Sequence, residues 1–394
     1  MAETAADFNN LGIKAYDAKQ FVDAIVNFER AYEGAPDSEV VRGNLCNAHQ
    51  AAANELVAKA NDFAAAAKHL EQAIGIDPKN PSPLVQLGAY YLRLDMIPDA
   101  IFRLEEAVEL SPTNLDAHEL LGQAYYEDND LPSARAQWDY VLEMDQGRES
   151  LRKQYEKAFR EESVEQDFHR SDSRHFRMSY PKGMTRQVQA RILTFLERAY
   201  MNIGRKFGGV YPPGQVQVIA YSAEQFTEAT QLESHVGALY DGKIRVPLTD
   251  GSGEDLAPDE MERRLMHEYT HVVVRFIAGE HVPWWLNEGL AETFSNELSE
   301  KDTTVLQRAY AEELDFSLSE IESSQLGVLS PEALGLAYAQ AHATTNLLWT
   351  RFGQHRLGQL LSDLAVGTTA EEALRRNYKR TYLALEQEVA DSFR

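Results

Sequence analysis

Two histidines four residues apart could bind a metal ion, in the segment His267-Glu-Tyr-Thr-His271. On a helix, side chains at this spacing leave the same face about one turn apart, so both imidazoles can reach one ion. Catalytic zinc takes three protein ligands and keeps a fourth position open for water. The pair therefore predicts a zinc site that needs a third donor.

Glu288 is the best candidate for that third donor. It lies in the segment 283–292, which reads as a second helix because Pro283 suits a helix start and Gly289 is the only helix breaker inside it. Gly289 and Ala291 are small enough to let this helix approach the histidine helix closely. A metal ion shared between two helices requires such an approach.

The histidine segment has clear helix signals over residues 258–279. Pro258 suits a first helical position, acidic residues follow in the first turn, and Gly279 suits a stop. One stripe of apolar residues recurs at spacings of three and four, which predicts a buried face beside the two histidines. The members of this stripe are Met261, Leu265, Tyr269, Val272 and Phe276.

The two segments together resemble the motifs of a known group of enzymes. His267-Glu-Tyr-Thr-His271 and the later Trp-Leu-Asn-Glu-Gly-Leu-Ala-Glu292 are similar to the zinc-binding motifs of the gluzincin metallopeptidases, the clan of thermolysin and the zinc aminopeptidases. Within that clan the chain looks most similar to peptidase-MA-like domains. The resemblance covers residues 170–392 and is strongest over 265–295.

The resemblance implies hydrolysis of peptide bonds that depends on Zn²⁺. His267, His271 and Glu288 are then the metal ligands. Glu268 is expected to take the proton of the attacking water and to pass it to the leaving nitrogen. Glu292 is expected to hydrogen-bond the far nitrogen of a ligand histidine, as residues behind metal ligands usually do.

A later helix offers two candidates for stabilising the oxyanion of the reaction. Tyr338 and His342 lie one turn apart on a helix expected from Pro331 to Phe352, ending at Gly353. A downstream tyrosine or histidine commonly has this role in the clan. Tyr338 is the first choice, with a place in the core as the alternative for it, and His342 is the second choice.

One departure from the clan bears on the kind of peptidase. The stretch Gly237-Ala-Leu-Tyr-Asp241 stands where the aminopeptidases carry a glutamate that binds the substrate amine, and Tyr240 takes the place of that glutamate. The stretch belongs to a hairpin signature over 236–246, because Asp241-Gly242 suits a two-residue turn. The missing amine anchor favours an endopeptidase, in which an extended peptide adds to a strand edge.

The first 146 residues contain an internal repeat. Ala24, Ala66, Ala100 and Ala134 follow one another at steps of 42, 34 and 34 residues, and the pair Leu-Gly recurs on the same period. This spacing of small and large residues matches the tetratricopeptide pattern of helix pairs. About four repeats are enough to stack into a short solenoid.

We therefore expect three parts: a tetratricopeptide solenoid over 1–146, a connecting helix over 147–168 and a gluzincin-like metallopeptidase domain over 169–394. The last part mixes strands, such as 175–180 and 216–221, with helices. The fold class expected is α+β, an all-α solenoid followed by a domain with a small sheet and the zinc-binding helix.

Composition narrows the classes of partner. The chain of 394 residues carries a formal net charge of −24, which argues against nucleic acid and against anionic membrane surfaces. No apolar run approaches the length of a membrane span, and the first residues lack the features of a signal peptide. As written, the sequence favours a cytoplasmic protein. A periplasmic or secreted protein is the alternative if a leader has been removed.

The expected function is zinc-dependent peptide hydrolysis, with the solenoid docking a protein partner or the substrate. Residues 1–165 hold 15 Lys and Arg against 30 Asp and Glu, so a basic partner fits this part of the chain. The alternative is a non-catalytic interaction scaffold with a vestigial metal site. Every group that the catalysis needs is present in the sequence, which favours the enzyme.

Overall fold

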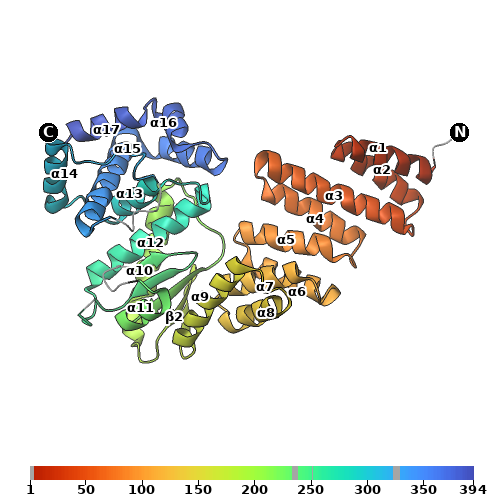
Figure 1. Cartoon of the computed structure of the whole chain (residues 1–394), viewed down its shortest axis with the longest axis horizontal. Helices are drawn as coiled ribbons and strands as arrows, with labels where there is room; N and C mark the ends of the chain where they lie inside the picture. The colour runs from red at the N-terminus through yellow and green to blue at the C-terminus, as the bar shows by residue number, and fades with distance from the viewer. Residues whose placement is uncertain (1–3, 233–237, 251, 323–328) are drawn as a thin grey trace. The chain divides into compact units, whose positions relative to one another are not determined.

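The chain forms two compact units, Met1–Ser163 and Val164–Arg394. The computed structural model describes residues 4–232, 238–250, 252–322 and 329–394 (Figure 1). None of the helices in these ranges is both long and apolar enough to cross a membrane.

The first unit consists of helices that pack in consecutive pairs, α1 with α2, α3 with α4, α5 with α6 and α7 with α8. Polar side chains cap several of their first turns: Thr4 begins α1 with a capping box, and Asn114 accepts hydrogen bonds at the start of α7. The helices are α1 Ala5–Asp17, α2 Phe21–Gly34, α3 Glu39–Ala60, α4 Phe63–Ile76, α5 Pro81–Arg93, α6 Ile97–Leu110, α7 Leu115–Glu127 and α8 Leu131–Met144.

A glycine on the first helix of three pairs explains the recurring sequence pattern. A Cβ atom at any of these glycines would lie 2.5 Å or less from a large side chain on the second helix of the pair. Without the Cβ atom the two helices approach closely and bury that side chain. The pairs are Gly12 with Phe28, Gly88 with Leu104 and Gly122 with Trp138. The predicted all-α, tetratricopeptide-like fold of this region is confirmed.

The longer first step of the repeat lies in one helix. α3 has 22 residues, whereas α1, α5 and α7 have 13 each. α3 ends at Asn61, whose left-handed backbone with φ of 52° closes the helix. The extra residues therefore lengthen one helix and leave the order of the pairs intact.

Helix α9 (Glu149–Glu165) joins the first unit to the second. The boundary between the units falls inside this helix, after Ser163, so its last residues belong to the second unit. The assignment of 1–146, 147–168 and 169–394 to separate domains stays a prediction.

Among the described residues, the second unit holds a five-stranded sheet in the order β1-β2-β3-β5-β4. β2, β3 and β5 are parallel, and the edge strands β1 and β4 are antiparallel to their neighbours. β4 and β5 form the predicted hairpin, of which Val236 and Gly237 lie outside the described residues. The sequence did not predict β1, because its four residues are all polar. The strands are β1 His169–Asp172, β2 Phe176–Tyr180, β3 Val216–Tyr221, β4 Leu239–Tyr240 and β5 Ile244–Pro247.

Successive side chains along each strand point to opposite faces of the sheet, and different helices pack on each face. Val218, Ile244 and Val246 point into the large core that α10 and α12 share. Ile219 and Tyr221 point to the other face, where they pack with α11. α12 therefore lies against one face of the sheet, where it contacts β4 and β5. These helices are α10 Arg186–Lys206, α11 Ala223–Thr230 and α12 Pro258–Ala278.

The rest of the second unit is helical. The prediction that the helix from Pro331 ends at Gly353 is confirmed, because α15 consists of two helices joined across a kink at this residue. The backbone leaves the helical region at Gly353, with φ of 74° and ψ of 179°, and then resumes as helix to Ala365. Glycine tolerates this conformation, so the first helix ends at Gly353 and a second helix follows directly. The helices are α13 Trp284–Ser295, α14 Glu300–Glu312, α15 Pro331–Ala365, α16 Ala370–Tyr378 and α17 Tyr382–Asp391.

A buried ion-pair network supports β5 and the turn that leads into it. The Arg245 side chain, 1% exposed, donates to the Asp241 carboxylate at 3.0 Å and to the Tyr221 hydroxyl at 2.8 Å. The Glu165 carboxylate lies 3.7 Å from the Arg245 guanidinium and accepts a hydrogen bond from Tyr221 at 2.5 Å. Because Asp241 directly follows β4, the network ties the edge strand to the last residue of α9.

Candidate metal centre

Helix α12 positions both histidines. Its N-terminus has Pro258 and two acidic residues in the first turn, and Gly279 follows its end, as predicted. Met261, Leu265, Tyr269 and Val272 are buried, but Phe276 is 42% exposed. The predicted stripe is therefore wrong at Phe276. The helix is contacted by α10, α13, α15, β4 and β5, so its buried face widens to Val273, Val274 and Ala278 and leaves Phe276 in solvent.

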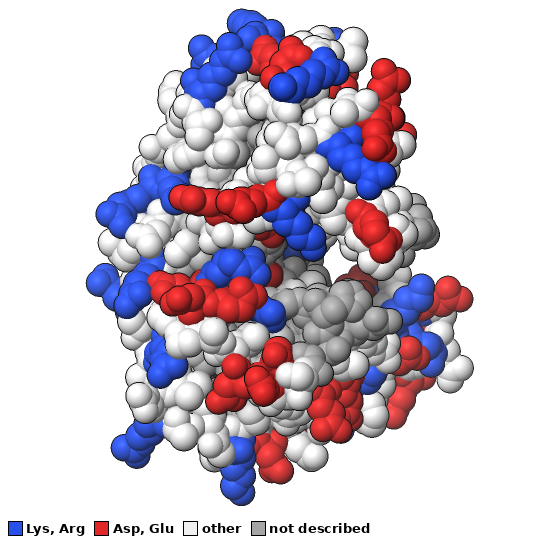
Figure 2. Space-filling view, turned by 90° about the vertical axis from the view of Figure 1, so that its left-hand side faces the viewer, with Lys and Arg blue, Asp and Glu red and all other residues white. Residues whose placement is uncertain are grey.

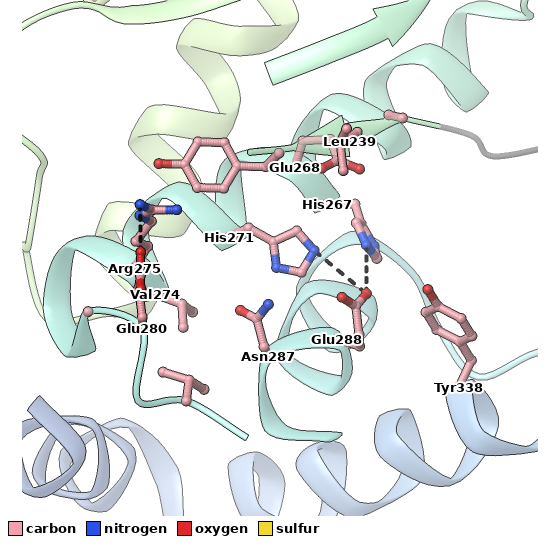
Figure 3. A pocket seen from close by; sticks show the side chains of 14 residues that line it. Leu239, His267, Glu268, His271, Val274, Arg275, Glu280, Asn287, Glu288 and Tyr338 are labelled. Atoms are coloured by element: carbon pink, nitrogen blue, oxygen red, sulfur yellow. Dashed lines mark hydrogen bonds and ion pairs between the residues drawn. The ribbon is translucent and has the colours of Figure 1, made fainter. Parts of the chain in front are cut away.

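Glu288 on α13 meets the two histidines on α12 (Figure 3). Oε2 of Glu288 lies 3.5 Å from Nε2 of His267 and 3.6 Å from Nε2 of His271. Ligands placed tetrahedrally around zinc, at its usual bond lengths, are about 3.3–3.5 Å apart. The three side chains form a group that can hold one metal ion, with all three ligand atoms within 4.8 Å of one another.

A close contact between α13 and α15 fixes the place of Glu288. A Cβ atom on the next residue, Gly289, would lie 2.3 Å from the carbonyl oxygen of Ala341. Glycine therefore lets α13 sit directly on α15. Thr293 and Thr345 share a hydrogen bond of 2.8 Å along the same contact.

The second nitrogen of His267 faces Glu292. Nδ1 of His267 lies 3.3 Å from Oε1 of Glu292, although the angles do not make this contact a hydrogen bond. Nδ1 of His271 is buried and has no hydrogen-bond partner among the described residues. Both Nε2 atoms point to the Glu288 carboxylate. The two rings are therefore oriented to bind a metal ion through Nε2.

The charges in the group are coupled. Burial lowers the pKa of His267, but the contact with Glu288 and the charges of Glu268 and Glu292 outweigh burial and raise the pKa to about 9. Burial raises the pKa of Glu268. For Glu288, burial acts in the same sense, but the charge of His271 and the contact with His267 outweigh it and lower the pKa. The buried carboxylates thus stabilise a positive charge placed between them. A bound divalent cation would supply that charge.

One cavity of about 320 Å³ contains the group. His267, His271 and Glu288 line it together with Glu268, which lies between the two histidines in sequence and is 5% exposed. β4 forms another wall through Leu239. The cavity therefore brings together the three predicted ligands, the predicted base and the edge strand.

The two oxyanion candidates differ in their positions. Tyr338 lines the cavity, and its ring packs edge-on against Trp284 at 4.9 Å. Burial and the charge of Glu288 raise the pKa of Tyr338, so its hydroxyl stays a hydrogen-bond donor. His342 is 4% exposed and is not among the residues that line the cavity in the described part of the chain. The geometry supports Tyr338 as the first choice.

A family model matches the part of the chain that carries this group. Residues 256–392 match the peptidase MA superfamily. The match runs from just before α12 to residue 392, so it includes both helices that carry the candidate ligands and Tyr338. The predicted resemblance to a peptidase-MA domain behind tetratricopeptide-like helices is confirmed. Among curated proteins, no sequence matches the chain.

Several solved tetratricopeptide proteins share helices with the chain. TTC0263, a thermophilic TPR protein of Thermus thermophilus, is 20% identical over 40% of this chain and 99% of that chain, with a TM-score of 0.24. MamA is 19% identical over 40% of this chain and 90% of its own, with a TM-score of 0.31. YrrB, a TPR protein with an unusual peptide-binding site, is 13% identical over 39% of this chain and 92% of its own, with a TM-score of 0.27. TM-scores this low carry no argument about function.

The sequence analysis missed three polar residues that line the cavity. Arg275 and Glu280 form an ion pair of 3.1 Å, and Asn287 precedes Glu288 on α13. Arg275 could have been found, because it lies four residues after His271 and so continues the face of the two histidines. Glu280 follows the end of the helix, where spacing gives no such signal.

Proposed function

We propose that the protein is a zinc-dependent endopeptidase. The observation that carries the proposal is the convergence of His267, His271 and Glu288 in one cavity, at separations that suit ligands of one ion. Glu268 adds a carboxylate that faces the same cavity. Three protein ligands beside an open cavity favour a catalytic site, because structural zinc sites are closed by four protein ligands.

Zinc bound there would supply Lewis-acid chemistry, lowering the pKa of a water and polarising a carbonyl. Glu268 accepts the proton that the attacking water gives up and donates it to the leaving nitrogen, because its carboxyl shares the cavity with the ligands. Tyr338 donates a hydrogen bond to the oxygen of the scissile carbonyl. Glu292 orients His267 from its Nδ1 side.

The edge strand supports cleavage inside a peptide chain. In the part of the chain that the structure describes, β4 has a neighbouring strand on one side only, and its Leu239 and Tyr240 line the cavity. An extended peptide can add to the open side through main-chain hydrogen bonds. Tyr240 carries no charge that would hold a free amine. These features favour an endopeptidase over an aminopeptidase.

We further propose that the first unit docks a basic protein partner or the substrate. Residues 1–165 carry −15 of the total charge of −24. Figure 2 faces the side of the second unit, where acidic and basic side chains are interspersed, whereas this acidic excess belongs to residues 1–165. The excess of acidic groups therefore favours partners of the first unit that are rich in Lys and Arg.

The test compares the full-length protein with Glu268→Gln on internally quenched peptides that are blocked at both ends. We expect one zinc per chain in both, and a loss of about 10²- to 10⁴-fold in cleavage for the variant, the usual contribution of positioned proton transfer. Glu262→Gln is the control and should cleave normally, because Glu262 lies on the same helix but pairs with Arg198 and does not line the cavity. If the wild-type protein binds zinc but cleaves no peptide, the scaffold alternative replaces this proposal.

A further inference from the structure

One end of the cavity has no part in the proposed catalysis. Arg275, Val274 and Glu280 lie beyond His271, whereas Tyr338 lies on the opposite side, past Glu288 (Figure 3). Arg275 follows His271 by four residues on α12, about 6 Å along the helix axis. An extended peptide advances about 3.3 Å per residue. A group bound at Arg275 therefore belongs to a substrate residue within about two positions of the cleaved bond.

Arg275 is the only Lys or Arg among the described residues that line the cavity. Its guanidinium pairs with Glu280 at 3.1 Å, and the two side chains are 48% and 69% exposed. An ion pair this exposed contributes little and exchanges easily with other partners. Arg275 is anchored inside the helix, whereas Glu280 stands on the segment after Gly279. Glu280 is therefore the member of the pair that an incoming anion can replace.

Asn287 provides a second group, which lies between Glu280 and Glu288 in the view of Figure 3. It lies beside Glu288 on α13 and lines the cavity, and its side-chain amide makes no hydrogen bond with any described residue. An amide of this kind offers two donors. A free amide donor in the same cavity as a displaceable guanidinium suits a ligand with several acceptor atoms.

We propose that Arg275 and Asn287 form a subsite for a carboxylate of the substrate, which displaces Glu280 from Arg275. Guanidinium binds carboxylate through two parallel hydrogen bonds, which makes it selective for this group over a neutral amide of the same shape. The carboxylate comes either from an Asp or Glu side chain or from the C-terminus of the peptide. The inference rests on the proposed peptidase function.

A purely structural role makes a different prediction. Arg275 stands in the last turn of α12, where a positive charge stabilises the helix end. If that were its whole role, replacing it would lower stability and affect every peptide alike. The preference between acidic and neutral peptides separates the two roles.

The test uses quenched peptides that differ only in Glu, Gln or Lys at each of two positions on either side of the cleaved bond, in amidated and free-acid forms. We expect wild-type kcat/KM to be at least about tenfold higher for Glu than for Gln at one position. Arg275→Gln should remove that difference, and Glu280→Gln should enlarge it. A preference for Glu in amidated peptides identifies a side-chain carboxylate, and a preference for free acids alone identifies the C-terminus.

Arg308→Gln is the matched control, because Arg308 pairs with Glu312 on the surface of α14 and does not line the cavity. It should keep the wild-type preference. The same peptides are also tested for equilibrium binding to zinc-loaded Glu268→Gln, with and without Arg275→Gln. If the protein binds peptides with a carboxylate more tightly, the subsite is supported even when no peptide is cleaved. The absence of cleavage would overturn only the peptidase function. Equal effects of Arg275→Gln on all peptides would overturn the subsite.

Discussion

The three proposed ligands owe their positions to different parts of the structure. His267 and His271 share one helix, so their separation follows from helix geometry alone. Glu288 reaches them only because α13 lies against α12. The histidine pair is therefore a local feature of the sequence, and the third ligand depends on packing.

We expect His271→Ala and Glu288→Ala each to weaken zinc binding severely, because water must then replace one of three protein donors. Glu292→Ala should be milder, with about 10- to 100-fold lower metal affinity, because Glu292 acts on His267 from behind. Competition with a chromogenic chelator measures all three affinities. Glu300→Ala, on α14, is the control. Full zinc retention in Glu288→Ala would show that another residue is the third ligand.

Tyr338 and His342 should respond differently to substitution. Tyr338→Phe removes a donor from the cavity, so we expect kcat to fall by about 10²- to 10³-fold while zinc content stays at the wild-type level. His342→Gln alters a buried residue that does not line the cavity, so its effect should be on thermal stability. Steady-state kinetics and thermal unfolding of both variants separate these effects. A larger loss of kcat in the histidine variant would reverse the assignment.

At the scale of elements, the contact of α13 with α15 holds the third ligand in place. Gly289→Ala would set a Cβ atom 2.3 Å from the Ala341 carbonyl oxygen, so α13 must shift. We expect a loss of about 1–3 kcal/mol in the free energy of unfolding, together with weaker zinc binding. Gly358→Ala is the control, because no atom lies within 4 Å of the added Cβ atom. It should leave zinc binding unchanged. Equal zinc affinity in both variants would show that α13 has room to move.

Elements with a strong internal pattern were predictable from the sequence. α12 was predicted with its ends because Pro258, Gly279 and the apolar spacing all agree. β1 was missed, since a short polar edge strand has no alternation of its own and forms only by pairing with β2. The helix end at Gly353 was predictable, because glycine suits a helix stop and allows the φ of 74° found there.

Some residues of the candidate site could likewise be predicted from the sequence and others could not. The histidines, Glu268 and Glu288 were predictable from spacing and resemblance. Arg275 and Asn287 were not, because a charged or amide residue on a helix usually faces solvent. Their shared position becomes visible only in the structure, where α12, α13 and β4 form one cavity that both residues line.

At the scale of the molecule, the stability of the first unit should depend on pH. Nδ1 of His49 lies 3.1 Å from Nδ1 of His69, and burial, with the nearby charge of His69, lowers the pKa of His49 to about 4. Between this pH and about 6.5, the ordinary pKa of histidine, the unfolded chain binds a proton that the folded chain does not. Stability contributed by neutral His49 is therefore present above pH 6.5 and falls as the pH drops toward 4.

The measurement is thermal unfolding between pH 7.5 and 4.5, with the imidazole signal of His49 followed by NMR. His49→Leu should flatten the slope of stability against pH in that window, because the titrating group is gone. An unshifted titration of His49 near pH 6.5 would contradict the prediction.

The ion pair between Glu165 and Arg245 limits how the second unit could be exchanged between proteins. The predicted domain begins at residue 169, and a piece starting there keeps Arg245 but leaves Glu165 behind. The guanidinium of Arg245 would then stay buried without one of its carboxylates, a loss that typically costs about 3–5 kcal/mol. A transplantable unit must carry the last turn of α9. In any recombination of these units, the end of α9 must be kept with the second unit.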